Sequence, residues 1–295
     1  MTYVCMHISQ GLGNQLFMAA LVVRLSHDKN AKLIFDSSAY RSDTRRKYQL
    51  DAFSIAATMW SDGDKDRLKL SPFRSLNPEY RRVRRTASLR RRSRVRERFF
   101  RFDEDILKLD VPVSLEGYWQ SERYFSDVEG LVRQQFRLRN PIAARRQDLL
   151  QLIGQAGASS VSLHVRRGDY VGLSQTGDSF RLCPLEWYER AMEMIADIVS
   201  APQFFVFSDD PGWARANLPE KWPCVFVDPG DDGKDFEDMH LMASCRHQII
   251  ANSTFSWWGA WLNASRDKTV IATAVWFPAP AADTSDLIPS GWIKL

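Results

Sequence analysis

Two stretches of the chain alternate short apolar runs with longer helical segments, the pattern typical of parallel α/β domains. Near the N-terminus this pattern predicts a strand at residues 2–9, a tight turn at residues 11–15, a helix at residues 16–27 and strands at residues 32–36 and 113–117. Between the last two strands, residues 40–110 are charged and irregular. The opening is therefore a βαβ unit of a parallel sheet.

The alternation is more regular in the second half. Strands are predicted at residues 160–165, 203–207, 224–227, 248–251 and 269–272. Helices are predicted at residues 184–199, 212–218, 234–244 and 255–264. Proline at the first of these helices and at position 211 fits the residue preference of helix starts. A second doubly wound domain follows from this order.

The length of 295 residues favours two domains over one. We expect a boundary at residue 150, between domains 1–150 and 151–295, with a basic insertion near residues 75–105. The fold class is α/β, with two Rossmann-like domains facing each other across a cleft.

Composition indicates a folded globular chain, with 44% hydrophobic residues and ten tryptophans. No apolar run reaches the ~20 residues that span a bilayer, and no secretory signal is recognisable, so we expect a cytoplasmic protein. The four cysteines show no C-x-x-C spacing. We expect buried reduced thiols, with neither a zinc site nor a disulfide framework.

The net charge of +4 hides one strongly basic block. Between Arg81 and Arg101 there are eleven arginines and one acid, Glu97, which gives 11 − 1 = +10. Such a block suits polyanions. The spacing of Val95 and Phe99 with neighbouring apolar residues allows a basic helix with a thin apolar stripe, which favours peripheral contact with an anionic membrane. No nucleic-acid partner is expected, and a solvated segment without a specific partner is the alternative.

One basic motif, His164-Val165-Arg166-Arg167-Gly168-Asp169, follows a predicted strand directly. Guanidinium groups make bidentate contacts with phosphate oxygens, and ligands of open α/β sheets bind beyond the carboxyl ends of the strands. This motif therefore predicts a phosphate site, with solvated surface arginines as the alternative.

A second motif, Asn252-Ser253-Thr254-Phe255-Ser256-Trp257-Trp258, follows another strand and opens an aromatic helix. Backbone N–H groups and hydroxyls at a helix start hold anions. The tryptophans are expected to be core residues.

A third motif is the Gly11-Leu12-Gly13 turn. It lacks the third glycine of a dinucleotide fingerprint, so it does not predict NAD binding. The amides of Asn14 and Gln15 stand at the following helix start, where they are placed to hold hydroxyls.

Five motifs in order resemble the α-1,2-fucosyltransferases of glycosyltransferase family 11. They are Gly11 to Phe17, Gly117-Tyr118-Trp119-Gln120-Ser121-Glu122, His164 to Tyr170, Phe207-Ser208-Asp209-Asp210 and Asn252 to Trp258. The resemblance runs from residue 4 to about residue 265 and leaves residues 40–110 largely uncovered.

The resemblance implies a GT-B fold and transfer of L-fucose from GDP-β-L-fucose to the 2-hydroxyl of a terminal β-galactoside, with inversion, in surface glycan biosynthesis. Whether the acceptor is lipid-linked stays open. The alternatives are fucosyl transfer with another linkage, and a polyanion- or membrane-binding protein with a degenerate transferase site.

The resemblance also assigns roles to residues. Arg166 should hold the β-phosphate, and Arg167 and His164 should lie around the nucleotide. Asp238 should accept guanine N–H groups, although an acid at a helix start also stabilises the helix dipole.

At the start of the second motif's helix, Ser253, Thr254 and Ser256 should reach phosphate oxygens. Asn14 should sit between fucose and acceptor.

The general base is unassigned. Asp169, Asp178 and Glu116 are candidates, and Asp169 has the alternative role of orienting the arginines. Related α-1,6 enzymes place the base ten residues beyond the motif histidine, where this chain has Ser174.

Two acidic pairs resemble metal motifs, but each has another explanation. Asp209-Asp210 precedes Pro211 at a predicted helix start, and Asp231-Asp232 lies in a glycine-containing loop. We expect no metal, since arginines can neutralise a diphosphate.

Overall fold

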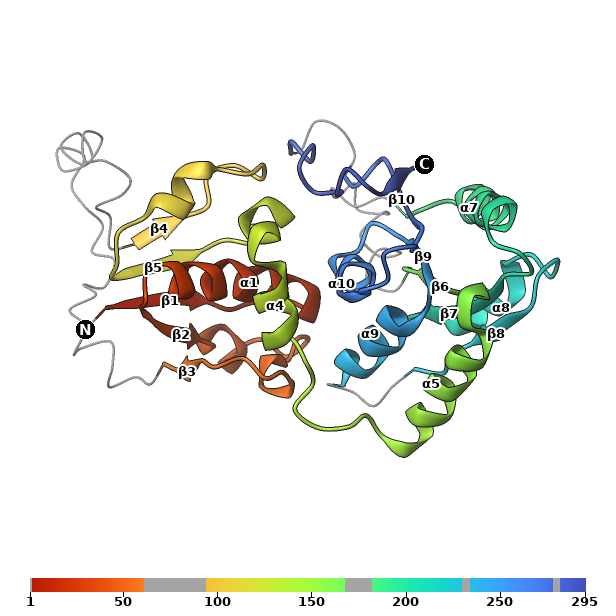
Figure 1. Cartoon of the computed structure of the whole chain (residues 1–295), viewed down its shortest axis with the longest axis horizontal. Helices are drawn as coiled ribbons and strands as arrows, with labels where there is room; N and C mark the ends of the chain where they lie inside the picture. The colour runs from red at the N-terminus through yellow and green to blue at the C-terminus, as the bar shows by residue number, and fades with distance from the viewer. Residues whose placement is uncertain (1, 61–93, 168–181, 230–233, 278–281) are drawn as a thin grey trace. The chain divides into compact units, whose positions relative to one another are not determined.

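The structure is a computed structural model that describes residues 2–60, 94–167, 182–229, 234–277 and 282–295. The chain divides into two compact units, Met1–Leu138 and Arg139–Leu295. Each unit holds a parallel sheet with helices packed against it, as predicted (Figure 1).

The first unit contains a sheet of parallel strands in the order β3-β2-β1-β5-β4. Its strands are β1 (Tyr3–His7), β2 (Lys32–Asp36), β3 (Thr58–Met59), β4 (Arg94–Arg96) and β5 (Val113–Glu116). Its α-helices are α1 (Leu12–Asp28) and α4 (Glu129–Gln135). The strand order reverses between β1 and β5, which is where ligands of doubly wound sheets bind.

Helix α1 begins at Leu12, earlier than the predicted start at residue 16. Gly11 is its N-cap, so Asn14 and Gln15 belong to the first turn of the helix. Nearly every apolar side chain from Leu12 to Leu25 is buried, which explains why the segment is apolar on all sides.

Short 3-10 helices complete the connections at Ser38–Arg41, Leu50–Ala52, Glu104–Lys108, Glu122–Tyr124, Ser126–Val128 and Gly157–Ser159.

The described end of the arginine-rich block is a strand, so the predicted basic helix is wrong there. Arg94–Arg96 form β4, which pairs in parallel with β5 at the edge of the sheet. Val95 is buried, while Arg94 and Arg96 both form ion pairs with Glu116. Residues 81–93 lie outside the described residues.

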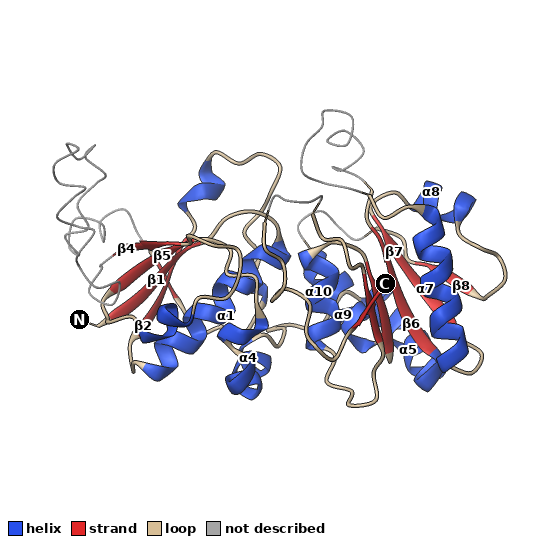
Figure 2. Ribbon diagram, turned by 90° about the horizontal axis from the view of Figure 1, so that it is seen from above, coloured by secondary structure: helices blue, strands red, loops and turns tan. Residues whose placement is uncertain are grey.

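The second unit contains a sheet in the order β11-β10-β9-β6-β7-β8. Its strands are β6 (Ser160–Val165), β7 (Gln203–Ser208), β8 (Cys224–Phe226), β9 (His247–Ile250), β10 (Val270–Ala272) and β11 (Ile293–Lys294). Its helices are α5 (Ala144–Ala156), α7 (Leu185–Ile198), α8 (Pro211–Asn217), α9 (Asp235–Ser244) and α10 (Thr254–Leu262). Figure 2 shows α7 and α8 on one face of this sheet and α9 and α10 on the other.

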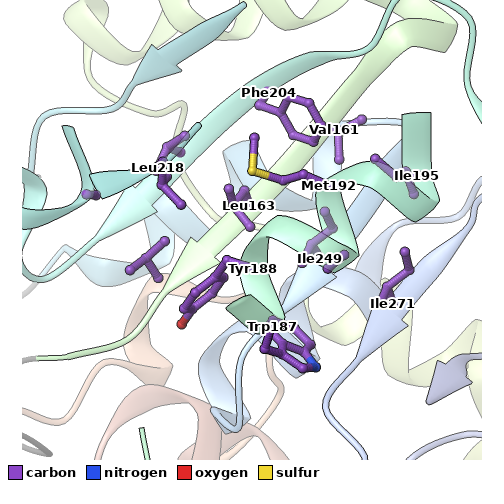
Figure 3. Close-up of a cluster of buried hydrophobic side chains, with 14 of the residues drawn as sticks. Val161, Leu163, Trp187, Tyr188, Met192, Ile195, Phe204, Leu218, Ile249 and Ile271 are labelled. Carbon is purple, nitrogen blue, oxygen red and sulfur yellow. The ribbon is translucent and has the colours of Figure 1, made fainter. Parts of the chain in front are cut away.

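Strand β6 is buried along its whole length, so its alternate side chains face opposite helical layers. Val161, Leu163 and Val165 pack in one core cluster with side chains of α7 such as Met192 (Figure 3). His164 belongs to the alternate side chains that face the opposite side of the sheet, and its ring centroid lies 5.8 Å from that of Phe255 on α10.

The unit boundary lies between Leu138 and Arg139, earlier than the expected residue 150. The reason is that α5 packs on α9 inside the second unit. Buried Arg146 of α5 forms ion pairs with Glu237 and Asp238 of α9. The sequence pattern alone does not show which unit a connecting helix joins.

Candidate active site

Three predicted motifs meet at one edge of the second unit's sheet. Strand β6 lies between β9 and β7, and all three run parallel. At their carboxyl ends, β6 is followed by Arg166, β7 by Asp209, and β9, after Ala251, by Asn252. The strand order reverses between β6 and β9, so the motifs stand at the expected ligand-binding position of this sheet.

The two arginines are held by the two aspartates that follow β7. Nη1 of Arg166 lies 2.7 Å from Oδ2 of Asp209. Oδ1 of Asp209 accepts the backbone N–H of Arg167 at 2.8 Å, so this one carboxylate orients both residues. Asp210 lies 3.4 Å from Nε of Arg167.

Asp210 has a second function that the sequence predicted. Its side chain caps α8 by accepting the backbone N–H of Trp213 at 3.0 Å, and Pro211 occupies the first turn. The guanidinium of Arg167 stacks over the Trp213 ring at 3.9 Å, an arrangement that fixes its plane. Asp209-Asp210 therefore serves as a helix start and as the support of the arginines.

His164 is only 5% exposed. Burial lowers its pKa to about 4, with Asp209 opposing the shift and Arg166 adding to it. The imidazole is therefore neutral at physiological pH. It can offer one N–H or one lone pair to a ligand but no charge, and its Nδ1 has no hydrogen-bond partner among the described residues.

Helix α10 begins beside this edge, with Ser253 as its N-cap. The hydroxyl of Ser253 makes no capping hydrogen bond, and Thr254 is the first, partly exposed residue of the helix. Ser256 is placed differently from the prediction. It is buried, and its hydroxyl donates to the carbonyl of Ser253 at 3.2 Å. In this rotamer Ser253 and Thr254 are better placed than Ser256 to meet a phosphate.

The tryptophans of α10 are core residues, as predicted. Trp257 and Trp258 are fully buried, and Trp257 stacks parallel to Trp261 at 6.3 Å. They anchor the helix whose first turn lies at the site.

Asp238 lies in the first turn of α9, and because α9 follows β8, this turn is at the carboxyl edge of the sheet. Its Oδ1 is buried 2.7 Å from Nη2 of Arg146. The side chain is nevertheless 22% exposed, so its accessible surface belongs to Oδ2 and the carbon atoms. In this arrangement the carboxylate presents one oxygen, not two, to a ligand.

Burial raises the pKa of Asp238 to about 6, and Arg146 opposes that shift. Neighbouring Asp235 and Glu237 add to the shift. Glu237 is itself buried and accepts the backbone N–H of Ala143 at 3.0 Å. Arg146 thus compensates buried Glu237 and partly buried Asp238, a role that sequence reasoning missed because the partners lie far apart in the chain.

The first unit places Asn14 at the reversal point of its own sheet. Asn14 follows β1, Gln120 follows β5, and Nε2 of Gln120 donates to Oδ1 of Asn14 at 2.8 Å. With its oxygen engaged, Asn14 has its NH₂ group to offer a ligand.

Gln15 does not have the role that the sequence suggested. It is fully buried, and its amide group binds three backbone groups, the carbonyls of Gln10 and Lys47 and the N–H of Gln49. Its side chain fixes the loops around the helix start and is not available to a hydroxyl ligand.

Glu97, the one acid of the arginine-rich block, is a supporting residue that its position in the sequence does not reveal. Its carboxylate accepts the backbone N–H groups of Tyr118 at 2.7 Å and Trp119 at 3.0 Å. Trp119 has a φ of 57° and Gly117 a φ of 153°. Glu97 therefore holds the irregular loop that carries Gln120 to Asn14.

Of the candidate bases, Asp169 and Asp178 lie outside the described residues, as do Ser174 and Asp231-Asp232. Glu116 is described. Burial would raise its pKa, but hydrogen bonds from Arg96 and Arg94 hold that pKa below the ordinary value. A carboxylate engaged in this way is a poor base.

The described residues contain no group of three or more His, Cys, Asp or Glu side chains arranged to hold a metal ion. Within the same residues, no helix is long and apolar enough to cross a membrane.

The model of glycosyl transferase family 11 matches residues 3–295 of the chain. The chain belongs to glycosyltransferase family 11. The match spans both units, so the family assignment covers the motifs at the ends of β6, β7 and β9 in the second unit and the Asn14 loop of the first unit alike.

Two relatives from Escherichia coli are similar over their whole lengths. The O-antigen biosynthesis glycosyltransferase WbnK is 29% identical and covers 99% of this chain and 100% of its own length. An alpha-1,2-colitosyltransferase is 30% identical, with 100% and 99% covered. Among solved structures, the NodZ alpha-1,6-fucosyltransferase co-crystallized with GDP has a TM-score of 0.52 at 18% identity, with 88% of this chain and 91% of that chain covered. That likeness confirms the predicted GT-B type of fold.

Proposed function

We propose that this glycosyltransferase moves L-fucose from GDP-fucose to the 2-hydroxyl of a terminal β-galactoside with inversion. One observation supports the proposal most. The second unit brings Arg166, Arg167 and the first turn of α10 together at the reversal point of its sheet. This edge has the donors that a departing nucleoside diphosphate requires.

The chemistry follows from charge. As the bond between C1 of fucose and the β-phosphate oxygen breaks, negative charge gathers on the diphosphate. Guanidinium groups that are already oriented by Asp209 and Trp213 stabilise that charge without reorganising. The backbone N–H groups at the start of α10 act in the same direction. Since these groups neutralise the diphosphate, we expect transfer to need no metal ion.

His164 contributes differently. Because its pKa is lowered to about 4, it meets the nucleotide as a neutral hydrogen-bonding group. It therefore orients the donor without adding a third positive charge.

Asp238 is the residue proposed to select guanine. Its accessible oxygen can accept an N–H group of the base, while Arg146 holds the other oxygen. Adenine has no N1–H and no 2-amino group, so ADP would leave the accessible oxygen of Asp238 without a partner.

Asn14 is proposed to act on the sugar side. Its NH₂ group can donate to a hydroxyl of fucose or of the acceptor, while Gln120 fixes its orientation.

The α-1,2 linkage is supported by the order of the five sequence motifs. One whole-length relative is also named for an α-1,2 linkage. The relative WbnK is named for O-antigen biosynthesis, which supports an acceptor in a surface glycan.

The same relatives give a second candidate, colitosyl transfer, because a colitosyltransferase is 30% identical over the whole chain. Colitose lacks the 3-hydroxyl of fucose. A site that hydrogen-bonds this hydroxyl would reject the deoxy sugar by about 10⁴-fold or more, whereas an apolar pocket would discriminate weakly.

A donor panel tests the proposal. Purified protein is incubated with a β-galactoside and GDP-fucose, GDP-colitose or GDP-mannose, in excess chelator, and kcat/KM is measured for each donor. We expect the highest value with GDP-fucose and no loss on chelation. A preference for GDP-colitose would establish the second candidate, and release of GDP without any sugar product would contradict both.

A further inference from the structure

The carboxyl end of β1 carries an imidazole–carboxylate pair that the roles above do not use. His7 is the last residue of β1, and Asp36, its register partner, is the last residue of β2. Nδ1 of His7 lies 3.3 Å from Oδ2 of Asp36. The His7 side chain is 35% exposed, so it is accessible to a ligand.

Asp36 is fixed independently of the histidine. Its Oδ1 accepts the backbone N–H of Ser38 at 3.0 Å, and its own carbonyl accepts the N–H of Ile8 at 2.8 Å. Burial would raise the pKa of Asp36, but hydrogen bonds from His7 and Ser38 hold that pKa well below its usual range. Asp36 is therefore a carboxylate, an acceptor only, at any physiological pH.

The tautomer of His7 follows from this partner. An ionised carboxylate can only accept, so Nδ1 of His7 donates and Nε2 keeps its lone pair. An imidazole held through Nδ1 by a carboxylate is oriented to take a proton at Nε2 and is stabilised once it has taken it.

The pair lies at the same edge of the first unit's sheet as Asn14. Strand β1 ends at His7, and α1 starts at Leu12, so only a short loop separates His7 from the first turn with Asn14. On the β5 side, Glu116 follows Leu115, the register partner of Met6. Glu116 accepts hydrogen bonds from Arg94 and Arg96 of β4. His7 is instead hydrogen-bonded to the carboxylate of Asp36.

We propose that His7 is the general base of transfer and that Asp36 is its positioning residue. The proposal rests on the proposed function. The acceptor hydroxyl oxygen forms a bond to C1 of fucose, the bond from C1 to the β-phosphate oxygen breaks, and GDP leaves with that electron pair. The hydroxyl proton passes to Nε2 of His7 and later to solvent.

The test compares kcat and the KM for GDP-fucose of the full-length protein and three variants. His7→Gln should lower kcat by about 100-fold or more, because a positioned base contributes about 10²–10⁴-fold. Its GDP affinity should stay within about twofold of wild type, since the nucleotide groups are in the other unit. Asp36→Asn should lower kcat and leave the KM for GDP-fucose unchanged, because Nδ1 of His7 loses the carboxylate that fixes its tautomer.

His27→Gln is the matched control. His27 also has Nδ1 3.3 Å from an aspartate oxygen, that of Asp28, but at the other end of α1. Its kcat and its KM for GDP-fucose should equal those of wild type.

Wild-type turnover in His7→Gln, or a wild-type kcat in Asp36→Asn, would overturn the proposal for His7 and leave the proposed function standing. A wild-type protein that neither binds GDP nor transfers a sugar would overturn the proposed function, and this proposal with it.

Discussion

Arg166 is the side chain on which the proposed chemistry depends most. Its contact with Asp209 at 2.7 Å aligns the guanidinium fork before any ligand arrives. Arg166→Lys keeps the charge and loses the fork, so kcat should fall by about 100-fold or more while folding is retained. Steady-state kinetics with a melting curve checks this.

The matched control for this variant is Arg215→Lys. Arg215 also pairs with an aspartate, Asp228, but on the exposed side of α8. It should turn over normally. Near-normal turnover in Arg166→Lys would remove this residue from leaving-group stabilisation.

Asp238 gives a prediction with a definite pH dependence. Its pKa in the free protein is raised to about 6, above the ordinary aspartate value, so the carboxylate is protonated in much of the protein below pH 6. The preference for GDP over ADP should therefore rise with pH through about 6 and level off above about 7. The ratio of the two dissociation constants cancels the titration of the phosphates.

Asp238→Asn should make the preference for GDP over ADP small and independent of pH. Because folding raises the pKa of Asp238, the protonated side chain adds to the free energy of unfolding. This contribution is complete below about pH 4 and is lost as the pH rises through about 6. From the sequence alone we would expect substitution of Asp238 to leave the melting temperature unchanged. The buried ion pair with Arg146 changes that expectation, since breaking such a pair costs about 2 kcal/mol or more. A GDP:ADP ratio that stays pH-dependent in Asp238→Asn would exclude this residue as the guanine acceptor.

Several residues show what a sequence can and cannot predict about single side chains. The motif with His164, Arg166 and Arg167 lies at the end of β6, and this position was predictable because a motif at a strand end has a defined place in a parallel sheet. Gln15 and Ser256 also follow strand ends, yet they bond to the backbone. Such local hydrogen bonds are alternatives to ligand binding that residue type does not reveal.

Among the elements, the loop from Gly117 to Gln120 is the one most tightly constrained. A Cβ on Gly117 would lie 2.3 Å from Cβ of Glu97 and 2.8 Å from its Oε2, with φ at 153°. Gly117→Ala should therefore displace Glu97 or the loop, costing about 1–3 kcal/mol of stability. Because the loop carries Gln120 to Asn14, the KM for the acceptor should rise while GDP affinity is unchanged.

Gly130→Ala in α4 is the control, since a Cβ there meets nothing within 4 Å. Alanine should be neutral or slightly stabilising in that helix. If Gly117→Ala has the same stability and acceptor KM as wild type, the loop does not position Asn14.

The strands with clear apolar runs, such as β6 and β9, were predictable because parallel strands are buried on both faces. Strand β4 was not, because it is an edge strand rich in arginine. Only Val95 of its three residues is buried, and the ion pairs with Glu116 that stabilise its arginines are long-range. Short edge strands of this kind have no period that a sequence shows.

At the scale of the whole chain, the arginine-rich block is still expected to contact an anionic membrane. Arg94 and Arg96 belong to the sheet, Arg98 forms an ion pair with Asp103, and Arg101 lies over the Phe99 ring. The substitution is therefore confined to the seven arginines between Arg81 and Arg92, which lie outside the described residues. Each basic residue near an anionic leaflet contributes about 1 kcal/mol, and salt weakens the attraction. Changing these seven to glutamine should abolish sedimentation with anionic vesicles and leave turnover of a soluble galactoside unchanged. Vesicle binding that survives the change would show that this block is not the membrane contact.

The two units share one design, in which chain segments far apart in sequence meet where the strand order reverses. In one unit this gathers Arg166, Asp209 and the start of α10, and in the other Asn14 and Gln120. These groups are proposed to transfer fucose to a galactose 2-hydroxyl. The direct test is NMR linkage analysis of the product formed from GDP-fucose and a terminal β-galactoside. We expect an α-1,2-linked fucose, formed by wild type and about 100-fold more slowly by Arg166→Lys. A product with another linkage or with the β configuration, or none at all, would contradict it.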